Sequence, residues 1–117
     1  MTVRIFEHTT EEQGPVRIAH LCGEVDSYTF DRFKGVIAPF IEDESPRVVL
    51  DCSDLTYLNS RGIGYLSQAH RQVVEKGGKL IVSGLNDRIR YVMDRVGLSG
   101  TLSICETLDD AVRQAES

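Results

Sequence analysis

The chain has 117 residues, of which 41% are apolar and 26% charged, and its formal net charge is −5. This length predicts one domain spanning residues 1–117, and the composition is typical of a soluble globular protein. The acidic balance argues against a nucleic-acid binder, because phosphate contacts need clustered Lys and Arg, which here are scattered along the chain.

Hydropathy and cysteine usage predict a cytoplasmic protein without membrane insertion. No apolar stretch approaches the ~20 residues needed to span a bilayer, and the first residues lack the apolar core of a signal peptide. Cys22, Cys52 and Cys105 are odd in number and far apart, and none belongs to a Cys-x-x-Cys pair. They predict buried, reduced thiols rather than a disulfide framework or a zinc site.

Alternating apolar and polar residues predict an N-terminal β-hairpin. Residues 2–7 and 16–22 each alternate, and a polar turn over residues 9–15 is expected to join them. A first helix follows on apolar residues at helical spacing: Phe30, Phe33 and Ile37. We expect Pro39 to end or kink this helix, since its ring clashes with the carbonyl four residues back.

The centre of the chain predicts a buried strand, a loop and an amphipathic helix. Residues 47–51 form a short continuous apolar run, which is typical of a strand covered on both faces. A loop is expected over residues 52–59, with Asn59 or Ser60 as the N-cap of the helix that follows. The apolar face of that helix comprises Ile63, Leu66, Ala69 and Val73.

The remaining elements repeat the alternation of strand and helix. Residues 79–83 predict a strand, and Asn86 or Asp87 caps the next helix. Residues 102–104 predict a brief edge strand, and Thr107 opens a last helix with a sequence like a capping box. The order β-β-α-β-α-β-α-β-α predicts an α/β fold: a mixed sheet with an N-terminal hairpin, parallel strands joined by right-handed crossovers, and about four helices.

The segment 51–64 is the strongest candidate for a functional site, because it joins the end of a buried strand to a helix N-terminus. There Ser60 would hold its hydroxyl where unpaired amides and the helix dipole favour negative charge, so the fold would tolerate a phosphate. Gly62 and Gly64 would let another protein approach Ser60. The alternative is that these residues serve only capping and the close packing of helix on sheet.

This segment resembles the STAS domains, and among them the bacterial anti-sigma factor antagonists. Residues 50–64 are similar to that family's pattern of a strand ending in Asp-x-Ser, then Leu/Val-x-Phe/Tyr, then Asp-Ser-Ser/Thr-Gly-hydrophobic-Gly. Residues 23–29 resemble its Gly-Glu-Leu/Val-Asp-x-x-Thr/Ser segment, and residues 77–82 its Gly-Gly-x-hydrophobic strand. The resemblance covers nearly the whole chain in the right order.

The resemblance implies a regulator of transcription and signal transduction rather than an enzyme. It implies partner switching, in which the unphosphorylated protein binds an anti-sigma factor that is also a serine kinase and is released from it by phosphorylation at Ser60. A PP2C-type phosphatase is a further candidate partner, and no cofactor or metal is expected. The implied partner-binding residues are Asp26, Thr29, Asn59, Ser60, Arg61, Gly62 and Ile63.

Two residues depart from the family pattern. Asn59 stands where the family usually has Asp, and Arg61 stands where it usually has Ser or Thr. Asn keeps the capping ability but removes a negative charge, whereas Arg61 adds a positive charge able to pair with a phosphate on Ser60. The altered pair indicates either a different kinase or a domain that is no longer phosphorylated.

Other functions are less consistent with the sequence. A receiver domain needs an acidic pair after its first strand, and here that strand ends in Glu7-His8. A hydrolase of the nucleophile-elbow type is disfavoured, because no Gly-x-Ser-x-Gly occurs. Within the STAS resemblance one alternative stays open, an accessory subunit of a lipid transporter or a stressosome scaffold without a phospho-switch.

Overall fold

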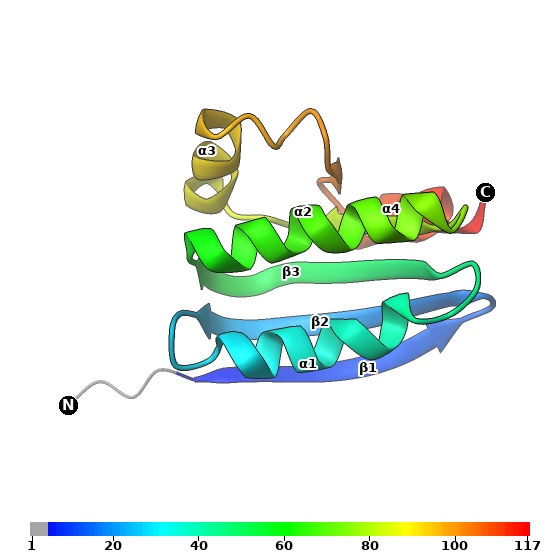
Figure 1. The fold of residues 1–117 in the computed structure, drawn as a ribbon, viewed down its shortest axis with the longest axis horizontal. Helices are drawn as coiled ribbons and strands as arrows, with labels where there is room; N and C mark the ends of the chain where they lie inside the picture. The colour runs from blue at the N-terminus through cyan, green and yellow to red at the C-terminus, as the bar shows by residue number, and fades with distance from the viewer. Residues whose placement is uncertain (1–4) are drawn as a thin grey trace.

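A five-stranded sheet forms the centre of the computed structural model, which describes residues 5–117 (Figure 1). In chain order the elements are β1 (Phe6–Gln13), β2 (Val16–Val25), α1 (Phe30–Ile41), β3 (Arg47–Leu58), α2 (Ser60–Glu75), β4 (Lys79–Ser83), α3 (Asp87–Arg95), β5 (Ser103–Cys105) and α4 (Leu108–Glu116). Strand β1 is antiparallel to β2, and the other neighbours are parallel. The predicted mixed sheet, N-terminal hairpin and element order are confirmed.

The first strand lies later in the chain than the alternation predicted. It covers Phe6–Gln13, so the stretch predicted as a polar turn is mostly strand, while residues 2–4 of the predicted strand lie outside the described residues. The turn itself is tight and contains Gly14, whose φ of 58° suits glycine. The polar residues are tolerated because β1 is an edge strand, exposed at every position after Phe6.

Strand β3 is longer than predicted, since the expected loop over residues 52–59 is mostly strand. Its second half pairs with the end of β2, from Cys22↔Asp54 to Val25↔Leu58. Two register shifts interrupt this pairing, and they break the period-two alternation by which a strand is recognised. The two long strands therefore carry the backbone directly to the start of α2.

Helix α1 continues past Pro39 to Ile41, so of the two predicted effects of this proline, an end or a kink, the end does not occur. Phe40 and Ile41, the two residues after it, are each only 6% exposed. Burial of these two side chains holds the last turn against the core and offsets the hydrogen bond that proline cannot donate.

The helices cover the two faces of the sheet unequally. Along β2, Ala19 and Leu21 belong to a large core with α1, α2 and α3, whereas Val16 and Ile18 point the other way into a smaller core beneath α4. Figure 1 shows α1 and α2 side by side along the sheet. Within residues 5–117, no helix is long and apolar enough to cross a bilayer.

The cysteines divide between these environments. Cys52 and Cys105 are buried as predicted, and burial raises the pKa of the Cys52 thiol to about 12. Cys22 is exposed, so the prediction of a buried thiol is wrong there. Cys22 lies on the same face of β2 as Val16, Ile18 and His20. It comes after the residues of that face that pack in the core under α4, and its side chain is exposed.

Candidate functional site

Asn59 fixes the start of α2 through three hydrogen bonds. Its backbone N–H donates to the carbonyl of Val25 at 3.0 Å, its Oδ1 accepts from the N–H of Gly62 at 2.9 Å, and its carbonyl accepts from the N–H of Ile63 at 3.0 Å. Asn59 is therefore the N-cap, and Ser60 is the first helical residue. The end of β2 and the start of α2 are thus held as one unit.

The side chain of Ser60 is exposed at this helix N-terminus. Among residues 5–117, no group forms a hydrogen bond with its hydroxyl. The amides of Ser60 and Arg61 precede the first intrahelical bond, so the helix dipole and these N–H groups favour negative charge nearby. The predicted position of Ser60, at the N-terminus of a helix, is confirmed.

The two glycines of the first turns have different surroundings. A Cβ on Gly62 would lie 2.5 Å from Cδ1 of Leu58 and 3.2 Å from Cγ1 of Val25. A Cβ on Gly64 would meet nothing within 4 Å. Close packing of the helix on the strand ends therefore explains Gly62, but it does not explain Gly64.

The turn between β2 and α1 is fixed by Asp26 and Thr29, which are 8% and 3% exposed. The Oδ1 atom of Asp26 accepts from the backbone N–H groups of Tyr28 at 2.9 Å and Thr29 at 3.0 Å. The hydroxyl of Thr29 donates to the carbonyl of Glu24 at 2.7 Å and accepts from the N–H of Asp26 at 2.9 Å. Both side chains thus shape the loop beside the site.

Arg61 connects α2 to α1 rather than extending into solvent alone. Its guanidinium lies over the ring of Phe30, 4.1 Å from the ring centroid, and the ring of Tyr65 meets Phe30 edge-on at 6.1 Å. Ile63 is 3% exposed and belongs to the large core. Of the predicted partner-binding set, Ser60 and Arg61 are exposed, whereas Gly62 and Ile63 are buried.

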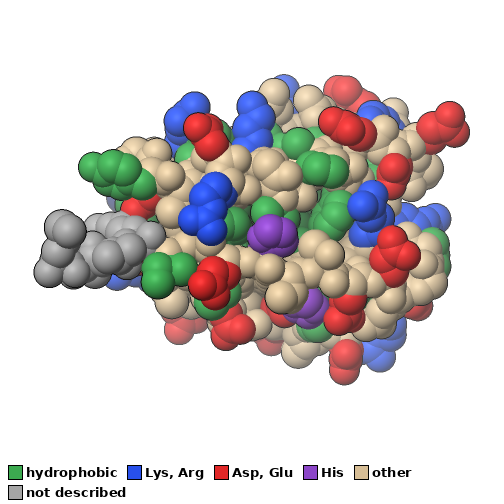
Figure 2. Space-filling view, turned by 90° about the horizontal axis from the view of Figure 1, so that it is seen from below, with side chains coloured by type: hydrophobic (Ala, Val, Ile, Leu, Met, Phe, Trp, Pro, Cys, Tyr) green, Lys and Arg blue, Asp and Glu red, His purple; other side chains and the backbone are tan. Residues whose placement is uncertain are grey.

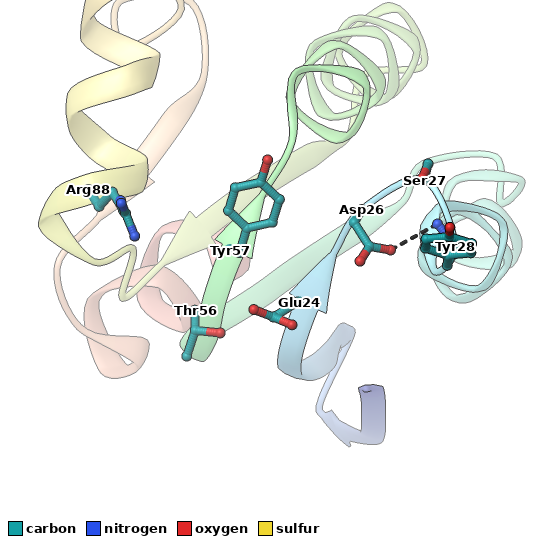
Figure 3. Close-up of a pocket in the computed structure, with 7 residues that line it drawn as sticks. All are labelled: Glu24, Asp26, Ser27, Tyr28, Thr56, Tyr57 and Arg88. Atoms are coloured by element: carbon teal, nitrogen blue, oxygen red, sulfur yellow. Dashed lines mark hydrogen bonds between the residues drawn. The ribbon is translucent and has the colours of Figure 1, made fainter. Parts of the chain in front are cut away.

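A groove of about 600 Å³ opens beside this helix start (Figure 3). It is lined by Glu24, Asp26, Ser27, Tyr28, Thr56, Tyr57 and Arg88. In Figure 3, Arg88 extends from α3 on one side of the groove, and Asp26 and Tyr28 lie on the other. Tyr28, Tyr57 and Arg88 were not among the residues predicted from the sequence. Tyr57 stands in the Phe/Tyr position of the family pattern, which was a usable signal.

Asp51, the acidic residue at the end of the predicted central strand, is held by hydrogen bonds from residues of the sheet. Asp51 accepts a hydrogen bond from His20 Nδ1 at 2.7 Å through one oxygen and from the Ser53 hydroxyl at 2.8 Å through the other. Burial alone would raise the pKa of Asp51, but these hydrogen bonds hold it below its usual value. Because Ser53 donates to Asp51 and not to His20, the cluster does not activate a nucleophile.

His20 lies between two carboxylates on neighbouring strands. Its Nε2 is 3.3 Å from Glu11 Oε2, so each ring nitrogen faces an acidic oxygen. The hydrogen bond to Asp51 raises the pKa of His20, and the contact with Glu11 adds to it. Within the part of the chain from residue 5 onward, no group of three His, Cys, Asp or Glu side chains is arranged to hold a metal ion.

Comparisons with known proteins agree with this geometry. The STAS domain model matches residues 7–111. An anti-sigma-B factor antagonist of Listeria monocytogenes is 26% identical over 72% of this chain and 74% of its own. An anti-sigma F factor antagonist of Paenibacillus polymyxa is 25% identical over 91% of this chain and 92% of its own. The chain is a STAS domain protein of the anti-sigma factor antagonist family.

Solved structures show the same STAS fold. An anti-sigma factor antagonist from Mycobacterium paratuberculosis superposes with a TM-score of 0.86 at 24% identity, covering 97% of this chain and 96% of that one. The Bacillus cell fate determinant SpoIIAA in its phosphorylated form gives a TM-score of 0.69 at 18% identity, covering 92% and 98%. Anti-sigma factor antagonists are non-enzymatic regulators, in agreement with the expectation from the sequence.

Charge on the surface of this STAS domain is mixed. On the β1 side, seen from below in Figure 2, the side chains of residues 5–117 are acidic and basic interspersed, without a continuous basic patch among them. With a net charge of −5, long-range attraction to nucleic acid is weak.

Proposed function

We propose that this STAS protein binds an anti-sigma factor with serine kinase activity while Ser60 is unmodified, and that phosphorylation of Ser60 ends this binding. The observation that carries the proposal is the exposed Ser60 hydroxyl at a helix start that Asn59 holds to the end of β2. Relatives of the chain are named as antagonists of anti-sigma factors. One protein with the same fold, SpoIIAA, is described in a phosphorylated form.

The physical consequences of a phosphate at Ser60 differ for the fold and for the complex. In the free protein the amides of Ser60 and Arg61 and the helix dipole stabilise the added charge, so stability changes by no more than about 1 kcal/mol. In a complex the phosphate would be buried at the interface, and burying an uncompensated charge costs several kcal/mol. Modification therefore releases the partner without unfolding the domain.

The departures at Asn59 and Arg61 bear on which kinase acts. Asn59 performs the capping that an Asp would perform, but without its charge. Arg61 adds a cationic side chain one residue after the acceptor, and its guanidinium lies over the ring of Phe30. We infer a kinase whose surface complements this more positive acceptor, a cytoplasmic location where ATP is available, and a PP2C-type phosphatase that resets Ser60.

The test mixes the purified protein with the anti-sigma factors of its organism, first without and then with ATP, and maps phosphate by mass spectrometry. We expect Ser60→Ala to bind but resist phosphorylation, and Ser60→Asp to fold normally and bind at least 10-fold more weakly. Ser45→Asp, in the exposed segment before β3 and at the far end of that strand from Ser60, is the matched control and should bind normally. Phosphate on Ser53, on Thr56 or nowhere, together with unchanged binding by Ser60→Asp, would reject the switch and leave a scaffold or accessory role.

A further inference from the structure

Helix α3 is held to the domain by few side chains. Ile89 and Met93 are 3% and 0% exposed, and they are the buried residues of this helix. Tyr91 is 62% exposed and Val92 38%. Figure 1 shows α3 at the same end of the molecule as the first turn of α2. Most of the α3 surface is therefore available to a partner that approaches Ser60.

Four residues of α3 share one face, which we call the α3 stripe: Arg88, Tyr91, Val92 and Arg95. Their spacing of three, four and seven residues brings them together on the side away from Ile89 and Met93. The guanidinium of Arg95 lies 6.0 Å from the ring centroid of Tyr91. Within residues 5–117, neither Arg88 nor Arg95 forms an ion pair.

The composition of the α3 stripe is that of an interface centre. Tyrosine and arginine are enriched among the residues that dominate binding energy, and adjacent exposed apolar side chains mark interaction surfaces. The stripe is also locally cationic in a chain of net charge −5. Arg88 connects it to the groove of Figure 3, whose Tyr57 lies on β3 close in sequence to Ser60.

We propose that the α3 stripe is a second docking patch for the anti-sigma factor, and that it receives an acidic segment of that partner. The proposal rests on the proposed function for the identity of the partner. Two exposed guanidiniums that make no ion pair within residues 5–117 can each pair with a carboxylate of a partner, and Tyr91 and Val92 can pack against an apolar side chain between those carboxylates. A second copy of this chain does not satisfy the stripe face to face, because like charges would meet. The acidic chain likewise disfavours nucleic acid.

The experiment measures the dissociation constant of the complex with the purified anti-sigma factor, without ATP, at two salt concentrations. We expect the double variant Arg88→Glu/Arg95→Glu to bind at least 30-fold more weakly and to depend less on salt. The double variant Arg90→Glu/Arg113→Glu is the charge-matched control, because Arg90 lies on the other side of α3, beside Asp87 and Glu106, and Arg113 lies on α4, over the opposite face of the sheet. We expect it to change affinity less than 3-fold, and thermal unfolding verifies that all variants fold.

Four outcomes separate this inference from the phospho-switch. If Arg88→Glu/Arg95→Glu binds normally while Ser60→Asp loses binding, the docking role of the α3 stripe is refuted and the phospho-switch is supported. If Arg88→Glu/Arg95→Glu loses binding while Ser60→Asp and the phosphorylated protein both bind, the phospho-switch is refuted and the docking role of the α3 stripe is supported. An equal loss of binding by Arg90→Glu/Arg113→Glu shows a general effect of net charge and refutes the docking role of the α3 stripe. No binding to any anti-sigma factor overturns both.

Discussion

Helices α2 and α3 begin in the same way and are anchored very differently. Each follows a parallel strand and is capped by an asparagine: Asn59 accepts from the N–H of Gly62 at 2.9 Å, and Asn86 accepts from the N–H of Ile89 at 2.8 Å. Yet α2 buries Gly62, Ile63, Leu66, Ala69 and Val73, whereas α3 buries only Ile89 and Met93. The cap sets where a helix starts, and the buried face sets how firmly it is held. A rigid acceptor site and an adaptable docking surface can therefore share one end of the domain.

The strongest test of this contrast removes one anchor from each helix. Leu66→Ala should lower the free energy of unfolding by about 3–4 kcal/mol, because its cavity lies in the shared core. Met93→Ala should cost about 2–3 kcal/mol and release α3 locally. Hydrogen exchange should then quicken throughout α3 while the amides of α2 stay protected. Equal protection of both helices in Met93→Ala contradicts the contrast, and Val92→Ala, at an exposed position, is the neutral control.

A second test exploits the two glycines of α2. Gly62→Ala should destabilise the domain by about 1–2 kcal/mol, because the new methyl group would press on Leu58 and Val25. Gly64→Ala should stabilise it by up to about 1 kcal/mol, since the site is open and alanine favours the helix. Chemical denaturation of both variants measures the difference. Changes of the same sign would show that the two positions are not packed differently.

The caps themselves should contribute similar, smaller amounts. Asn59→Ala and Asn86→Ala should each cost about 1 kcal/mol, the usual value for losing an N-cap. Asn86 should be the more sensitive, because its Nδ2 also donates to the carbonyl of Leu55 at 3.3 Å. Asn59→Asp should retain stability, since Asp caps as well as Asn. Circular dichroism during thermal unfolding is sufficient to rank the three variants.

The smallest effect lies in the sheet, away from both helices. The pKa of His20 is raised by its hydrogen bond to Asp51. A raised pKa in the folded state contributes stability that is complete below the unfolded value of about 6.5 and is lost as pH rises through the folded value. The stability difference between wild type and His20→Gln should therefore shrink by up to ~1 kcal/mol between about pH 5.5 and 9. A difference that grows with pH would refute this assignment.

Sequence patterns predicted the order of elements because the apolar periodicity of the helices is strong. Leu66, Ala69 and Val73 were expected on the buried face of α2, and they are buried. The cap could not be chosen between Asn59 and Ser60 from composition, since both residue types cap well. The structure selects Asn59, whose ψ of 172° is extended while Ser60 is already helical.

Two features of the site depend on contacts that local patterns do not encode. The second half of β3 was expected to be a loop because the register shifts leave Ser53 and Asp54 both exposed, without alternation. The position of Arg61 depends on which residue of α1 comes alongside, and Phe30 is distant in sequence. Arg88 reaches the groove by the same kind of tertiary juxtaposition.

The length of β3 has a practical consequence for observing the protein at work. The strand has 12 residues, so at about 3.3 Å per residue it spans about 40 Å between Arg47 and the start of α2. Arg47 donates a 2.6 Å hydrogen bond to the carbonyl of Ala115, which places the end of α4 at the opposite end from Ser60 (Figure 1). A fluorophore attached at Glu116 would therefore stay clear of a partner docked at Ser60. Its anisotropy would report the slower tumbling of the complex without disturbing its contacts.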